Sequence, residues 1–157
     1  MNIITIDYSM ATQSMDIFFS GCRMGSHCPG CHNSEAWDFN AGSEWTKWIN
    51  KIKDDIRTFS GMTKRIFILG GEPLDQDHDE LEKFLTTIFT DSVVEQNMEL
   101  WLFTRYEIDQ VPDRFKHIFH YIKTGPYREE LTVPDNISHG VRLATSNQRV
   151  LKKGVDY

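Results

Sequence analysis

Three cysteines lie close together near the start of the chain, at Cys22, Cys28 and Cys31. They are the only cysteines in the 157 residues, and an odd number cannot all pair as disulfides. The first residues show no basic stretch followed by an apolar run, so we expect no secretory signal and a cytoplasmic location. Thiols stay reduced there. Reduced, clustered thiols favour a metal site.

The cysteine segment follows the apolar run Met15–Ser20, which predicts a buried strand. Open α/β folds place their ligand sites at the carboxyl ends of strands. Three thiolates would leave one iron of a four-iron cluster without a protein ligand. Pro29 stiffens the gap between the last two cysteines, and Gly30 lets it bend. The alternative is a structural zinc ion with His27 or His32 as the fourth ligand.

The rest of the chain alternates between short apolar runs and segments with helical periodicity. Further strands are expected at 66–69, 100–103 and 119–122, with shorter ones at 141–143 and 149–151, and a helix capped by Ser43 is expected through Phe59. This alternation predicts a mostly parallel sheet. The strands are too few to close an eight-stranded barrel of ~250 residues. We therefore expect one α/β domain over residues 1–157, folded as an open partial (βα) barrel.

The second apolar run ends in Gly70-Gly71-Glu72-Pro73. Glycines let a backbone approach a ligand closely, and Glu72 offers a carboxylate that can accept hydrogen bonds from an ammonium group. Alone, the turn favours a simple strand-to-helix connection with a solvated glutamate; its pairing with the cysteines reverses that preference. The acidic segment that follows, 75–80, is interpreted as a solvated helix start that complements the helix dipole.

Charge and hydropathy exclude some classes of partner. The net charge is −6, whereas a nucleic-acid-binding domain usually carries a basic face. No apolar run approaches the ~18 residues of a membrane span. We therefore expect neither nucleic acid nor membrane as a partner.

The cysteine segment and the Gly-Gly-Glu turn, in this order, resemble the radical S-adenosylmethionine superfamily. Its members place a three-cysteine loop after the first barrel strand and a Gly-Gly-Glu-type turn after the second. Longer segments look like the activating enzymes of anaerobic ribonucleoside-triphosphate reductases. These segments are FFSGC at 18–22, CPGCHNSEAWDF at 28–39, WLFT at 101–104, TGPY at 124–127 followed by Glu130-Leu131, and SNQRV at 146–150.

The resemblance implies a site and a reaction. The three cysteines would hold a 4Fe-4S cluster, and its open iron would bind S-adenosylmethionine. Reductive cleavage would release methionine and a 5′-deoxyadenosyl radical, which would take a hydrogen atom from a glycine of the reductase large subunit. An electron donor such as flavodoxin is also implied. Because the cofactor does the chemistry, no paired general acid and base is expected.

The resemblance also assigns contacts to S-adenosylmethionine. Gly30 and His32 would flank the adenine beside Cys31. Gly71 and Glu72 would receive the methionine amino group, and Thr104 could contact the ribose.

Two departures from the family pattern stand out. Five residues separate Cys22 from Cys28 instead of the usual three, with the extra length around Gly25-Ser26, and this keeps His27 as a candidate ligand. Arg105 stands where relatives tend to have glycine. Two other functions remain open: a small-molecule radical enzyme resembling 7-carboxy-7-deazaguanine synthase, and a non-catalytic zinc-binding module.

Overall fold

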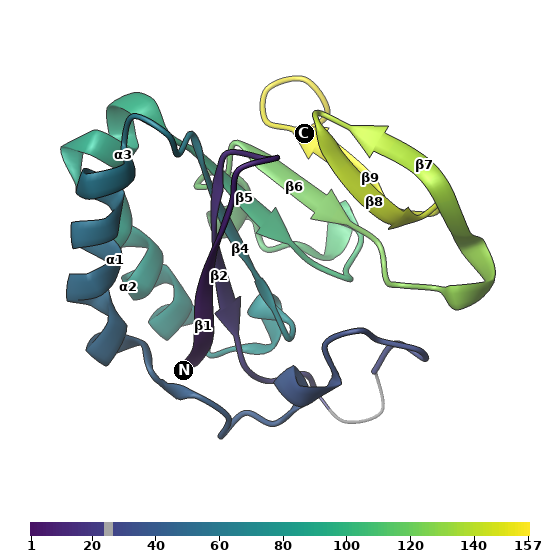
Figure 1. Cartoon of the computed structure of the whole chain (residues 1–157). Helices are drawn as coiled ribbons and strands as arrows, with labels where there is room; N and C mark the ends of the chain where they lie inside the picture. The colour runs from purple at the N-terminus through teal and green to yellow at the C-terminus, as the bar shows by residue number, and fades with distance from the viewer. Residues whose placement is uncertain (24–26) are drawn as a thin grey trace.

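The computed structural model describes residues 1–23 and 27–157, and its centre is a seven-stranded sheet in the order β3-β1-β2-β4-β5-β6-β9 (Figure 1). Neighbouring strands are parallel across the four central ones. The outer strands β1, β3 and β9 are antiparallel to their neighbours. The bounds are β1 (Asn2–Ser9), β2 (Ser14–Phe19), β3 (Ser43–Glu44), β4 (Arg65–Gly70), β5 (Glu99–Phe103), β6 (Tyr121–Thr124) and β9 (Arg149–Lys152).

Within the described residues this sheet remains open, with β3 and β9 as its edges. The predicted α/β class, the largely parallel centre and the absence of closure are thus confirmed.

One face of the sheet is covered by helices (Figure 1). Side chains alternate along a strand, so Ile66 and Ile68 of β4 pack into the core shared with the helices, while Phe67 points to the other face. The helices are α1 (Trp45–Phe59), α2 (His78–Phe89), α3 (Ser92–Asn97) and α4 (Asp113–Lys116), with 3-10 turns η1 (Ser34–Trp37), η2 (Pro73–Asp75), η3 (Ile108–Gln110) and η4 (Glu129–Leu131).

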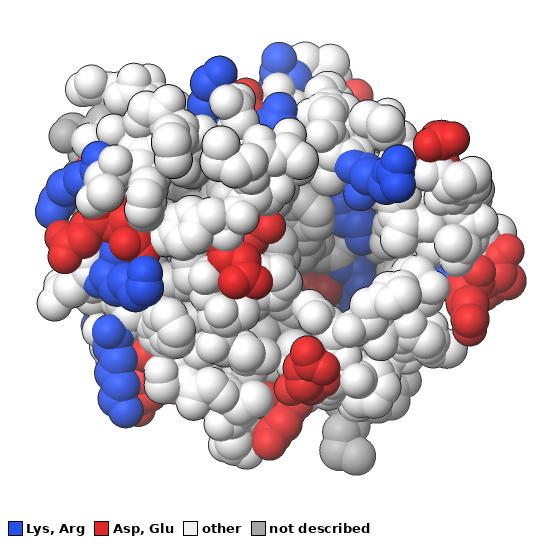
Figure 2. Space-filling view, viewed as in Figure 1, with Lys and Arg blue, Asp and Glu red and all other residues white. Residues whose placement is uncertain are grey.

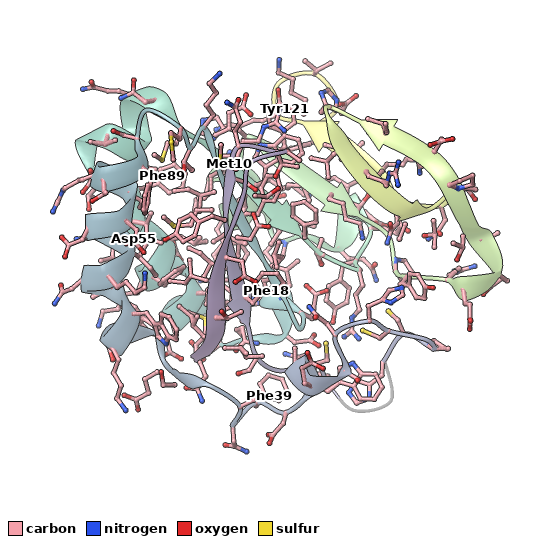
Figure 3. The ribbon with its side chains drawn as sticks, in the orientation of Figure 1. Met10, Phe18, Phe39, Asp55, Phe89 and Tyr121 are labelled. Atoms are coloured by element: carbon pink, nitrogen blue, oxygen red, sulfur yellow. The ribbon has the colours of Figure 1, made fainter. Side chains whose placement is uncertain are left out.

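A separate hairpin, β7 (Thr132–Ser138) and β8 (Val141–Thr145), contributes to the packing on the opposite face. Phe67, Trp101 and Tyr121 form an aromatic row there, with the Trp101 and Tyr121 ring centroids 4.3 Å apart. Val141 and Leu143 of β8 pack against this row. Figure 3 shows Tyr121 at the end of the sheet next to the hairpin.

Several boundaries differ from the sequence expectations. The first strand, β1, was not predicted. Helix α1 begins at Trp45, because Ser43 pairs with Ile3 as part of β3; the Ser43 hydroxyl accepts a hydrogen bond from Trp48 Nε1 (2.8 Å) instead of capping the backbone. Strand β6 begins two residues later than expected. Among the described residues, no helix has the length and apolar character needed to cross a bilayer.

Candidate cofactor site

The loops that follow β2, β4, β5 and β6 meet at one edge of the sheet, because parallel strands end on the same side. They enclose a cavity of about 270 Å³. In the same orientation as Figure 1, Figure 2 shows the molecule hollowed between the sheet and the hairpin, with Lys and Arg side chains on the wall. The cavity is lined by Cys22, Cys28, Cys31, Asn33, Trp37, Leu69, Gly70, Gly71, Glu72, Phe103, Thr104, Arg105, Lys123, Tyr127 and Gln148.

The cysteine loop is closed by hydrogen bonds between its two ends. Gly21 N donates to Ala36 O (2.7 Å), and Cys22 N donates to Trp37 O (3.0 Å). Phe39 packs directly on Gly21, whose φ is 102°; Figure 3 shows Phe39 at the base of this loop. The first cysteine is therefore held in place at the end of β2.

Pro29 and Gly30 form a tight turn between the last two cysteines. Cys31 N donates to Cys28 O (3.1 Å), and Gly30 has a φ of 71°, which matches a type II turn with Pro then Gly at its centre. Cys31 Sγ accepts a hydrogen bond from Asn33 N (3.4 Å). This geometry presents two thiols from one turn, as the sequence predicted.

The loop histidines contact aromatic rings. His27 stacks on Trp37 with ring centroids 4.1 Å apart, and its Nε2 lies 3.2 Å from Cys22 O. His32 meets Tyr127 edge-on at 5.2 Å. His32 and Gly30 lie outside the residues that line the cavity, and Gly30 packs against Tyr127 and Glu129. The proposed extra length around Gly25-Ser26 lies outside the described residues.

The Gly-Gly-Glu turn packs against the backbone that leads into the cysteine loop. Gly71 N donates to Phe19 O (2.7 Å), and Glu72 N donates to Gly21 O (2.8 Å). A Cβ on Gly71 would lie 2.4 Å from Gly21 O and 2.8 Å from Ala36 O. Glycine is required here because two backbone segments of the protein itself touch.

Glu72 is buried at the inner end of the cavity, with 2% of its surface exposed. Its Oε1 accepts hydrogen bonds from Leu74 N (3.1 Å) and Thr104 Oγ1 (2.7 Å), and its Oε2 accepts from Arg105 N (2.8 Å). Burial raises the pKa of Glu72 to about 7, although these three donors oppose the increase. The alternative interpretation, a simple turn with a solvated Glu72, is therefore wrong for this chain.

Thr104 lies in the cavity, where its hydroxyl donates to Glu72 and accepts from Tyr106 N (3.2 Å). Arg105 joins the same cluster through its backbone N–H. The hydrogen bonds at the end of β5 are thus directed to the carboxylate.

Two further lining residues were not predicted. Lys123, on β6, donates from Nζ to Gly125 O (2.8 Å), and burial lowers its pKa to about 8. Gln148 is buried, and its Oε1 accepts from Ala144 N (3.1 Å). The available signals were a lysine inside an otherwise apolar strand and the SNQR segment.

Asp75 corrects the interpretation of the acidic segment. It is 5% exposed, whereas the helix start was expected to be solvated. Asp77 does cap α2, accepting from Asp79 N (3.1 Å) and Glu80 N (2.9 Å).

The donor set suits a cluster. Within residues 1–23 and 27–157, no three Cys, His, Asp or Glu side chains are arranged to hold one metal ion. In a 4Fe-4S cluster each thiolate would bind a different iron, so the three cysteines would face one cluster and not one metal ion. Burial, followed by the charge of Glu72, raises the pKa of Cys22 to about 12. Because thiolate is the form that binds iron, cluster binding would require this thiol to lose its proton.

Comparison with known proteins agrees with this donor chemistry. A protein of Escherichia coli (strain K12) named anaerobic ribonucleoside-triphosphate reductase-activating protein is 27% identical over 139 residues, covering 85% of this chain and 84% of that protein. A protein of the same name from Salmonella typhi has the same identity and coverage. These findings confirm the resemblance drawn from the sequence motifs. A family model for a 4Fe-4S single cluster domain matches residues 13–151, so the chain belongs to that iron–sulfur family.

Proposed function

We propose that this protein is a radical S-adenosylmethionine activating enzyme, which generates a glycyl radical on an anaerobic ribonucleoside-triphosphate reductase. The open sheet would then be a partial barrel of the radical S-adenosylmethionine type. The observation that carries the proposal is one cavity lined by Cys22, Cys28 and Cys31 together with Glu72 and Thr104. The names of the curated relatives support the same activity and partner.

The cysteines would hold three irons of a 4Fe-4S cluster. When bound, the cluster and S-adenosylmethionine together would supply the electron transfer and the radical. The remaining roles fall to the protein. Glu72 would accept hydrogen bonds from the amino group of S-adenosylmethionine, and Gly71 would hold that carboxylate against the cysteine loop. Thr104 would orient Glu72, and its contact with the ribose is a further part of the proposal.

Gly30 and His32 would sit beside the adenine, on the side of the cysteine loop that faces Tyr127. The cavity walls would keep water from the reactive radical. The large reductase subunit would present its glycine at the cavity, and a donor such as flavodoxin would reduce the cluster.

The test is an anaerobic mixture of reconstituted protein, dithionite, S-adenosylmethionine and the cognate anaerobic ribonucleoside-triphosphate reductase. A glycyl radical doublet in the electron paramagnetic resonance spectrum is the expected result. Cleavage of S-adenosylmethionine with no radical on the reductase would refute this partner and favour a small-molecule radical enzyme. A colourless protein that retains one zinc ion would instead identify a zinc-binding module.

A further inference from the structure

Asp75 occupies a buried position between three loops of the site. Its Oδ2 accepts hydrogen bonds from Arg23 N (2.7 Å) and Arg105 Nη2 (2.7 Å), and its Oδ1 accepts from Tyr106 OH (2.6 Å). The donors lie 52, 30 and 31 residues away along the chain. One side chain thus links the cysteine loop, the turn after β4 and the loop after β5.

The charged groups of Asp75 and Arg105 are buried next to each other. The side chain of Asp75 is fully buried and that of Arg105 is 13% exposed. A buried carboxylate is costly unless it is paired and hydrogen-bonded, and removal of one partner leaves the other charge uncompensated. The Arg23 side chain, by contrast, is 65% exposed with its Nε 3.7 Å from Oδ1, so its ion pair contributes little. The main contact between the cysteine loop and Asp75 is therefore the hydrogen bond from the backbone N–H of Arg23.

The hydrogen bonds of Asp75 join the two parts of the proposed cofactor site, which are the first cysteine and Glu72. Arg23 directly follows Cys22, so its N–H fixes the backbone next to the first cysteine. Arg105 donates its backbone N–H to Glu72, while its guanidinium binds Asp75. The position of Cys22 relative to Glu72 therefore depends on Asp75, in addition to the contacts at Gly21.

We propose that Asp75 is a positioning residue that fixes the first cluster cysteine relative to the Glu72 carboxylate, acting as a unit with Arg105. This inference rests on the proposed function, because it concerns the geometry between cluster and S-adenosylmethionine. It also explains the departure at Arg105: the guanidinium is enclosed by Asp75 and by Tyr106, whose OH accepts from Nη2 (3.1 Å).

The test compares Asp75→Asn with wild type in the full chain, reconstituted anaerobically with iron and sulfide. Asparagine keeps the volume but turns one acceptor oxygen into a donor that faces other donors. We expect normal iron content, altered g values of the reduced cluster, and a KM for S-adenosylmethionine raised about tenfold, which corresponds to the middle of the range for coupled polar groups. Asp79→Asn is the matched control, because Asp79 lies in the same acidic segment with an 88% exposed side chain and pairs with Arg114.

The double variant Asp75→Asn with Arg105→Met tests whether Asp75 and Arg105 act together. We expect its KM to be no higher than that of the worse single variant, whereas multiplied effects would overturn the pairing. Wild-type g values together with wild-type KM in Asp75→Asn would overturn the positioning role. If Asp75→Asn does not take up iron, Tyr106→Phe replaces it. That variant removes one hydroxyl from Oδ1, and unchanged g values and KM would again refute the idea.

The two proposals fail differently. A wild-type protein with a full cluster that neither binds nor cleaves S-adenosylmethionine would refute the proposed function. The g values and midpoint potential of Asp75→Asn, measured without S-adenosylmethionine, would still test the placement of Cys22.

Discussion

Replacing Glu72 by glutamine should remove a pH-dependent loss of stability from the iron-free protein. Burial raises the pKa of Glu72 to about 7 in the folded chain, compared with its ordinary value of 4.5. Between these values the folded chain holds a proton that the unfolded chain has released. The stability contributed by the protonated group is therefore fully present below pH 4.5 and is lost as the pH rises through 7.

The magnitude follows from the two pKa values. The full difference corresponds to roughly 3 kcal/mol, of which about 2 kcal/mol falls between about pH 5.5 and pH 8. Glutamine also places an NH₂ group among the donors Thr104 Oγ1, Leu74 N and Arg105 N. That cost is about 1–3 kcal/mol and does not change with pH, so it drops out when the pH profiles are compared.

The assay is urea denaturation of both proteins without iron, under anaerobic reducing conditions, across this pH range. The free energy of unfolding of wild type should fall by about 2 kcal/mol relative to that of Glu72→Gln. Parallel profiles for the two proteins would refute the reasoning, because they would mean that Glu72 is already ionised in the folded chain at low pH. The same proton must leave before the carboxylate can accept hydrogen bonds from an amine on both oxygens.

Three further predictions concern the same edge of the sheet. Gly71→Ala should lower the free energy of unfolding by at least about 2 kcal/mol, because the added Cβ would overlap backbone atoms. Gly61→Ala is the control: a Cβ there has no atom within 4 Å, so this variant should melt at or above the wild-type temperature. Equal melting temperatures for the two variants would contradict the steric argument. Cys28→Ala should abolish both the brown colour and the cleavage of S-adenosylmethionine, and iron analysis showing a wild-type cluster would contradict its role as a ligand. Thr104→Val removes a donor to Glu72 and should raise the pKa of Glu72 further, which would move the wild-type stability transition to higher pH; an unmoved transition would show that this hydrogen bond does not favour the ionised carboxylate.

The parts of the fold that were predicted correctly depend on local pattern. The apolar run at Met15–Ser20 forms most of strand β2 (Ser14–Phe19), because Met15, Ile17 and Phe19 are buried in the core shared with the helices. Ser43 shows where local reasoning failed. Its hydroxyl suits a helix cap, but Ser43 pairs with β1 and so belongs to a strand. Strand β1 itself was not predicted from the sequence.

The residues of the candidate site were likewise predicted only in part. Clustering alone predicted that Cys22, Cys28 and Cys31 are metal ligands, and the structure places all three on one cavity. Asp75 was misinterpreted, because no local pattern distinguishes a buried carboxylate from a solvated one at the start of a helix. Its burial depends on donors at least 30 residues distant.

The sequence by itself determined the chemistry of this protein: three thiols after a strand, two of them joined by a Pro-Gly turn, and a carboxylate at the end of the next strand. These features are local, because turn geometry and strand burial depend on a few adjacent residues. Only the tertiary structure decided how the carboxylate is used. Parallel strands bring Glu72, Thr104 and Lys123 to one edge of the sheet. The close backbone contact at Gly71 packs the Gly-Gly-Glu turn against the cysteine loop. Burial at that edge, which no single segment encodes, raises the pKa of Glu72 and encloses Asp75 with Arg105.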